Sequence, residues 1–263
     1  ISGICIGIAV LGTCTSLVVR RTAVANPGAP FDVSGLAIHR ATWRLLRGDR
    51  ALRGVLLISS LFWFVGGVVL PAVNTFGKVQ LGLSDSRTSI LAACMGVGIA
   101  VGCVAAGKLS RGRIESRLVT AGGWGIFACL ALVAWLGATS RPLTAAATEQ
   151  PPQSLAELLA LVHTVHPAEW PARWLLTGLG LSAGLFVVPL QVFLQKRPPR
   201  AQKGRMIGTM NLVNWIGILL AAGFYFAASA VFTPGRIGWT FAALAAFMLP
   251  VAVFYRPPDE PLE

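Results

Sequence analysis

The stretch VLLISSLFWFVGGVVLPAVNTF, residues Val55–Phe76, decides the fold of this chain. It contains no charged residue. A helix of about 20 apolar residues spans the ~30 Å hydrocarbon core of a bilayer, so this segment is long enough to cross a membrane. Inside lipid the backbone must satisfy its own hydrogen bonds, and a continuous apolar run of this length does so as a helix. The sequence therefore predicts a transmembrane helix here.

Six further apolar runs lie on either side of this stretch. They are Ile1–Val19, Ser89–Gly107, Val119–Thr139, Trp174–Leu194, Ile207–Phe232 and Ile237–Phe254. The mean hydropathy is +0.70 and 12% of the residues are charged, which leaves no room for a water-soluble core. The chain is therefore predicted to be an all-α polytopic membrane protein with seven transmembrane helices.

The basic residues orient these helices. When the runs alternate across a bilayer, 17 of the 22 Lys and Arg residues fall on one side. The other side holds Lys78, Arg87, Arg141, Arg173 and Arg236. Loops rich in Lys and Arg face the cytoplasm, so the N-terminal end is predicted to lie outside and the C-terminus inside, with the bacterial inner membrane as the expected location. The net charge of +12 suits anionic lipids as partners, and its spread over short loops argues against nucleic acid.

The order of the segments predicts four regions. Residues 1–19 begin inside an apolar run, without an initiator Met or a basic flank, and are expected to be the last helix of a preceding N-terminal bundle. Residues 20–54 form a cytoplasmic linker, residues 55–255 a six-helix bundle, and residues 256–263 a cytoplasmic tail or linker. The linker part GLAIHRATWRLLRGDRALRG mixes apolar side chains with arginines, which favours an amphipathic helix in the membrane interface over a solvated connection.

Polar side chains inside the apolar runs are the best indicators of a substrate site, because they are costly in hydrocarbon unless they face a cavity or a partner. Four amides stand out: Asn74, Gln191, Asn211 and Asn214. The last two are three residues apart and share one helix face. We interpret these amides as substrate-binding candidates, with helix–helix hydrogen bonding as the alternative. No Asp or Glu lies deep in a run, so the sequence shows no carboxylate relay for protons or sodium.

Small residues also recur at helical spacing. Gly98 and Gly102 are four residues apart, as are Gly180 and Gly184. This spacing lets two helix backbones approach closely, which supplies packing energy where lipid offers no hydrophobic drive. Tight packing is the simplest interpretation, and a seam that slides during transport is the alternative.

The outside loop of residues 140–173 contains SLAELLALVHTV, a candidate surface helix. His163, His166 and Glu169 follow, a set that resembles a weak metal site, but histidines in an exposed connection are usually unliganded. The five cysteines all lie in apolar runs and form no ligand set. Neither a metal nor a cofactor is predicted.

The run GKLSRGRIE, Gly107–Glu115, resembles the second-half copy of the loop signature of the major facilitator superfamily. The resemblance implies that Gly107, Lys108, Arg111 and Arg113 belong to a cytoplasmic gating loop. Arg111 stands where the signature usually has an acidic residue, which puts the charge relay of that loop in doubt.

Longer stretches narrow the resemblance. ISSLFWFVGGVVLPAVNTFGKVQLG, LAACMGVGIAVGCVAAGKLSRGRIESRLV and LSAGLFVVPLQVFLQKRPPRAQKGRMIGTMNLVNWIGILLA resemble the lysophospholipid transporters of that superfamily, including those fused to glycerophospholipid acyltransferases. The resemblance runs from about Thr42 to the last span. It implies a C-terminal six-helix half of the fold, with residues 1–19 as the sixth of twelve helices.

That family flips lysophospholipids, chiefly lysophosphatidylethanolamine, to the inner leaflet for reacylation. The resemblance therefore implies an alternating-access transporter of a lysolipid, with an acyltransferase, fused or separate, as a possible partner. Apolar spans suit one acyl chain, the four amides suit the glycerol hydroxyl, and Lys78 and Lys196 are candidates for the phosphate at the two mouths. Movement driven downhill by reacylation needs no carboxylate relay.

Two alternatives remain open, and two further classes lack a residue that they need. A facilitator of another small molecule, such as a drug or sugar, has the same spans, and so does a non-transporting membrane anchor for a fused acyltransferase. A retinal protein needs a lysine in its last span, and Ile237–Phe254 has none. An acyltransferase needs an Asp five positions after a His, which is absent here, so this fragment is not expected to be an enzyme.

Overall fold

The fold is seen in a computed structural model of the chain. It describes residues 2–19, 38–110, 113–140, 152, 154–165, 169–232, 236–258 and 260–261. The chain divides into two compact units, residues 1–37 and 38–263. In the first unit α1 (Ser2–Leu17) is apolar, and its described side chains are exposed. Its hydroxyl groups bond to carbonyls one turn earlier, as Thr13 does to Ala9 at 2.9 Å, which satisfies them without water.

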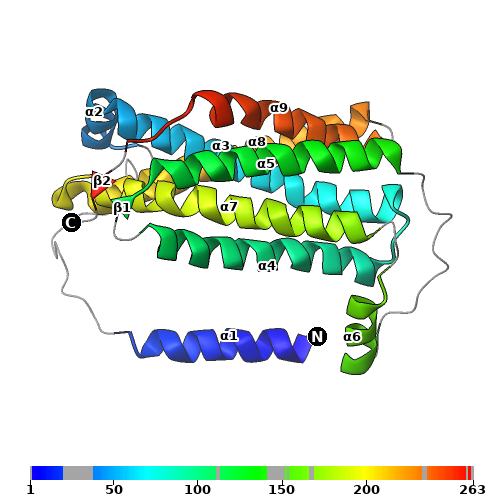
Figure 1. Cartoon of the computed structure of the whole chain (residues 1–263). Coiled ribbons are helices and arrows are strands. Elements are labelled where there is room, and N and C mark those ends of the chain that lie inside the picture. The colour runs from blue at the N-terminus through cyan, green and yellow to red at the C-terminus, as the bar shows by residue number, and fades with distance from the viewer. Residues whose placement is uncertain are drawn as a thin grey trace. The chain divides into compact units, whose positions relative to one another are not determined.

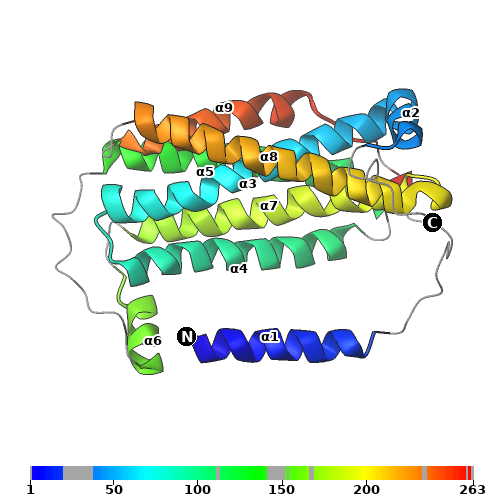
Figure 2. The same ribbon diagram turned by 180° about the vertical axis from the view of Figure 1, so that it is seen from behind.

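The second unit is a bundle of long helices lying side by side (Figures 1 and 2). They are α3 (Arg50–Thr75), α4 (Asp85–Leu109), α5 (Ser116–Thr139), α7 (Trp170–Lys196), α8 (Lys203–Val231) and α9 (Gly238–Phe254). Five of them, α3, α4, α5, α7 and α8, have the length and composition to cross a membrane. The helix α9 is apolar but shorter. The described residues are thus overwhelmingly helical, in agreement with the predicted all-α membrane class.

Short elements mark the two ends of this bundle. One end, called the basic end here, carries α2 (Arg40–Gly48), the turn η3 (Arg200–Gln202) and a pair of two-residue strands, β1 (Arg113–Ile114) and β2 (Glu260–Pro261). The opposite end, called the tryptophan end, carries η2 (Phe76–Gln80) and α6 (Leu155–His163). Four exposed tryptophans lie near helix termini at this end: Trp135, Trp170, Trp174 and Trp239. Such a belt is typical of a membrane–water interface.

The two glycine pairs identified in the sequence face each other in the seam between α4 and α7. A Cβ atom added to Gly98 would lie 2.1 Å from the Thr177 carbonyl oxygen. One added to Gly180 would lie 2.1 Å from the Met95 carbonyl oxygen. Both distances are far inside van der Waals contact, so the two backbones touch because these positions lack side chains. The glycines therefore pack α4 against α7.

The linker helix is shorter than the amphipathic stretch suggested. Within the described residues α2 ends at Gly48, and α3 begins at Arg50 and continues into the membrane run. Asp49 separates them because its side chain caps α3, accepting the Leu52 amide at 3.0 Å, and also pairs with Arg197 at 2.8 Å. Burial opposes ionisation of Asp49, but the Leu52 amide and Arg197 outweigh it and hold its pKa below the ordinary value.

The apolar side of α2 packs against protein. Leu46 is buried in the main hydrophobic core of the second unit, while Trp43 stays exposed under the Arg47 guanidinium, 5.1 Å from the ring centre. The remaining part of the predicted linker, residues 20–37, lies outside the described residues.

Candidate functional site

An apolar groove runs between α3, α4 and α7, with a volume of about 460 Å³. Its lining includes Trp63, Gly66 and Leu70 of α3, Met95 and Ile99 of α4, Gly180, Ala183 and Val187 of α7, and Ile218 of α8. The sequence builds this hollow by placing small residues, Gly66 and Ala183, between large apolar ones. A Cβ added to Gly66 would meet no atom within 4 Å, so the space beside it is open.

Three polar side chains lie one helical turn beyond the groove, on the side of the basic end. Ser59 precedes the lining residues of α3, Gln191 follows those of α7, and Asn214 precedes Ile218 on α8. The Ser59 hydroxyl donates to Asn214 Oδ1 at 3.2 Å, and Gln191 Nε2 donates to the Ser59 oxygen at 3.4 Å. Ser59 and Asn214 are buried, whereas Gln191 is partly exposed. An apolar groove that ends at uncharged polar groups suits an amphiphile with a single chain.

The structure therefore brings two of the four predicted amides together and leaves two apart. Asn74 is exposed near the tryptophan end of α3, 15 residues from Ser59, which corresponds to about 22 Å along the helix. Asn211 lies one turn from Asn214 but is exposed, because the face of α8 that packs on α3 passes through Asn214 and Gly217. Ser59 was not singled out from the sequence, because a serine in a membrane run usually bonds to its own helix.

The predicted cations lie at opposite ends of the bundle. Lys78 in η2 pairs with Asp85 at 2.7 Å at the tryptophan end, and Lys196 is the last residue of α7 at the basic end. In the predicted gating loop, Gly107 and Lys108 form the exposed end of α4. Arg113 lies in β1, opposite Pro261 of β2. Arg111 lies outside the described residues.

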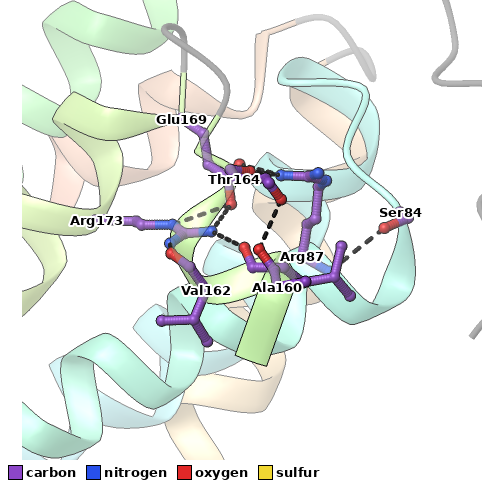
Figure 3. A network of polar contacts seen from close by, with 8 residues as sticks. Ser84, Arg87, Ala160, Val162, Thr164, Glu169 and Arg173 are labelled. Atoms are coloured by element: carbon purple, nitrogen blue, oxygen red, sulfur yellow. Dashed lines mark hydrogen bonds and ion pairs between the residues drawn. The ribbon is translucent and has the colours of Figure 1, made fainter. Parts of the chain in front are cut away.

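A buried ion cluster that the sequence did not predict lies at the tryptophan end (Figure 3). Glu169 is fully buried and pairs with Arg173 at 2.7 Å and with Arg87 at 3.1 Å. The two guanidinium groups also donate to backbone carbonyls, Arg173 to Val162 at 2.8 Å and Arg87 to Thr164 at 2.8 Å. The cluster thus joins α4, α7 and the C-terminal turn of α6. Its signal in the sequence is the i, i+4 spacing of Glu169 and Arg173 at the start of an apolar helix.

Metal-binding residues do not gather in the described part of the chain. No group of three or more His, Cys, Asp or Glu side chains lies there within reach of one ion. Glu169 is engaged by two arginines instead of by a histidine, and His166 lies outside the described residues.

Comparison with known proteins identifies the family. Residues 1–222 match the family model of the Major Facilitator Superfamily. The lysophospholipid transporter LplT of Escherichia coli O157:H7 is 28% identical over 242 residues, which cover 89% of this chain and 52% of that protein. LplT of Shigella sonnei gives the same values, and LplT of Citrobacter koseri is 28% identical over 239 residues. The chain spans about half the length of these relatives, and no solved structure matches it. The resemblance seen in the sequence is therefore confirmed, and the chain belongs to the major facilitator superfamily.

Proposed function

We propose that this chain contributes the C-terminal six-helix bundle, and the helix before it, to a transporter that moves lysophospholipids across the membrane. The observation that carries the proposal is the apolar groove with its Ser59, Gln191 and Asn214 polar end. The similarity to proteins named as lysophospholipid transporters supports the same substrate class. In this proposal an acyl chain lies along α3 and α7, and the polar end meets the glycerol hydroxyl and the phosphate.

The groove and its polar end have different energetic roles. Moving an acyl chain from lipid tails into the groove is close to neutral, because both surroundings are apolar. The polar headgroup instead loses hydrogen bonds when it enters the membrane, which costs several kcal/mol per unpaired group in an apolar medium. The hydroxyl and amides at the end of the groove offset part of this cost. The groove therefore carries the chain, and the polar end lowers the barrier for the headgroup.

The remaining polar candidates suit successive stages of one path. Asn74 and Lys78 are exposed near the tryptophan end and meet the headgroup on entry. Gln191 and Asn214 hold it midway, and Asn211 and Lys196 lie toward the basic end, where it leaves. With the basic end in the cytoplasm, this path carries a lysophosphatidylethanolamine-type lipid to the inner leaflet by alternating access. The loop of Gly107, Lys108, Arg111 and Arg113 gates that side.

Reacylation supplies the driving force in this scheme. None of the residues that line the groove is acidic, and the groups at its polar end are a serine and two amides. In this scheme the lipid moves downhill, and an acyltransferase, fused or separate, removes the lysolipid inside. Such an enzyme is the expected partner.

The experiment uses the full-length protein in vesicles and follows fluorescent lysophosphatidylethanolamine across the bilayer, with the diacyl lipid as control. Gly66→Leu fills the groove without a backbone clash and is expected to abolish lysolipid movement. Gly223→Leu is the matched control, since Gly223 has equally open surroundings but does not line the groove. Both variants must elute as folded protein.

Two results contradict the proposal. Equal transport by the Gly66→Leu and parent proteins removes the groove from the path. No lysolipid movement by the folded parent protein points instead to another facilitator substrate or to a membrane anchor for an acyltransferase.

A further inference from the structure

A second hollow lies at the tryptophan end, between the termini of α5 and α9. It has a volume of about 620 Å³. Small residues create it, with Ala134, Gly137 and Ala138 on α5 facing Gly238 and Ala242 on α9. It shares no residue with the apolar groove, so it does not belong to the transport site proposed above.

The floor of this hollow is fixed by Gln80. This side chain is buried, accepts a hydrogen bond from the Gly238 amide at 3.1 Å and donates to the Gly137 carbonyl. It thereby satisfies the last turn of α5 and the first amide of α9 at once. Gln80 therefore links the C-terminal turn of α5 to the first turn of α9 and forms part of the wall of the hollow.

The rim of the hollow carries one cation and two aromatic rings. Arg236, Trp135 and Trp239 all line it, and both indoles are more than half exposed. The Arg236 side chain forms no hydrogen bond or ion pair within the described part of the chain. The other described cations of this end, Lys78, Arg87 and Arg173, all have carboxylate partners. None of the lining residues is acidic. The hollow is therefore a positively charged site.

We propose that this hollow binds a membrane phospholipid of the leaflet at the tryptophan end, with its phosphate on Arg236 and one acyl chain along the seam of α5 and α9. A guanidinium group binds phosphate oxygens through paired, charge-assisted hydrogen bonds. Exposed tryptophans place the rim at the depth of lipid headgroups. The short side chains of Ala134, Ala138 and Ala242 border the hollow and leave room for a chain below that depth. A site with one cation and no carboxylate in its lining favours an anionic headgroup such as phosphatidylglycerol over a zwitterionic one.

The test is native mass spectrometry of the delipidated full-length protein, titrated with phosphatidylglycerol. Arg236→Gln is expected to weaken the first lipid adduct about tenfold, as the loss of one charged phosphate contact predicts. Arg205→Gln, which removes an exposed arginine at the basic end, is expected to leave that adduct unchanged. Ala138→Phe fills the hollow without altering the charge and is expected to remove the adduct. Ala230→Phe, at an exposed position of α8, is the control and is expected to leave the adduct unchanged.

Competition with inorganic phosphate and with lysophosphatidylethanolamine shows which phosphate-bearing molecule the hollow binds. Phosphatidylglycerol adducts that persist in excess inorganic phosphate support a lipid site, and displacement by inorganic phosphate alone overturns it. Binding of lysophosphatidylethanolamine in preference to phosphatidylglycerol, with the same loss in Arg236→Gln, overturns the assignment to bulk phospholipid and makes this a substrate site. Equal adducts in Arg236→Gln and Arg205→Gln also overturn it.

Discussion

At the scale of single residues, the buried Glu169 is the most consequential side chain outside the groove. One carboxylate lies between two guanidinium groups, and each guanidinium also donates to a backbone carbonyl at the end of α6. A charge buried at this depth is tolerated only when paired and hydrogen-bonded on every side. The cluster therefore fixes α6 to the ends of α4 and α7, as Figure 3 shows.

Glu169→Gln is expected to destabilise the folded protein by about 3 kcal/mol, because the buried Arg173 and the partly buried Arg87 lose the carboxylate that they share. The measurement is thermal unfolding of the purified protein in detergent. Asp85→Asn is the control at the same end, since Asp85 is largely exposed in its pair with Lys78 and its loss should barely move Tm. Equal shifts in the two variants would show that the cluster does not stabilise the fold.

The substrate-binding roles predicted from the sequence stay predictions, and the structure shows which of these side chains lie together. The scarcity of amides in apolar runs drew attention to Gln191 and Asn214, which meet at Ser59. Sequence alone did not separate Asn214 from Asn211, because the direction of a helix face depends on which neighbour packs against it. The sequence predicts a loop position for Glu169, because the burial of a charge depends on partners distant in the chain, here Arg87.

At the scale of secondary-structure elements, helix backbones approach each other closely at glycine positions. The α4–α7 seam contains glycines on both helices, and the α3–α8 seam follows the same rule at Gly217, where a Cβ would lie 2.6 Å from the Ser60 carbonyl oxygen. Around these contacts hydroxyl groups bond across the seams, as Ser60 does to the Val213 carbonyl at 2.8 Å. Packing in lipid thus relies on close backbones and a few interhelical hydrogen bonds.

Gly180→Ala is expected to destabilise the bundle by about 1–3 kcal/mol, because the new methyl group forces α7 away from α4. Gly96→Ala is the matched control on α4, where an added Cβ meets no atom within 4 Å. It should leave Tm unchanged or slightly raised, as alanine favours the helix. The measurement is the thermal unfolding curve of each variant. A Gly180→Ala protein as stable as the Gly96→Ala protein would contradict the tight packing of α4 against α7.

The elements themselves follow from the sequence with small differences. Apolar length predicted where helices lie, and α5 ends at Thr139 as the hydrophobic run does. The helix α3 begins five residues before its apolar run, because the Asp49 cap and not hydropathy sets its first turn. The amphipathic pattern of the linker continues across Asp49. The periodicity of its apolar residues therefore did not reveal the break between α2 and α3.

At the scale of the whole molecule, the two ends of the bundle differ in chemistry. The basic end collects arginines on α2 and on the first turn of α3, and the tryptophan end collects indoles and a buried ion cluster. In a bilayer this asymmetry fixes the orientation, because cation-rich connections remain in the cytoplasm. The basic end is thus expected to face inward.

This orientation is tested by labelling single cysteines in intact cells with a membrane-impermeant maleimide, in a background from which the five native cysteines are removed. Ala156→Cys on α6 should react in intact cells. Arg200→Cys in η3 should react only after permeabilisation, since it lies at the basic end. Both residues are exposed, so reactivity reports their side of the membrane. The reverse pattern would invert the proposed direction of transport.

The glycine seam also has a genetic consequence. Every single-nucleotide change of a glycine codon that alters the amino acid introduces a Cβ atom, and at Gly98, Gly102, Gly180 and Gly184 that atom collides with the backbone of the facing helix. Every missense change at these four codons is therefore expected to destabilise the bundle, whereas an added Cβ at Gly66, Gly96, Gly208 or Gly223 meets no atom within 4 Å. In a saturation library scored for the abundance of the protein in the membrane, missense variants at the four seam glycines should be depleted. Missense variants at the four open glycines should keep nearly the parent abundance.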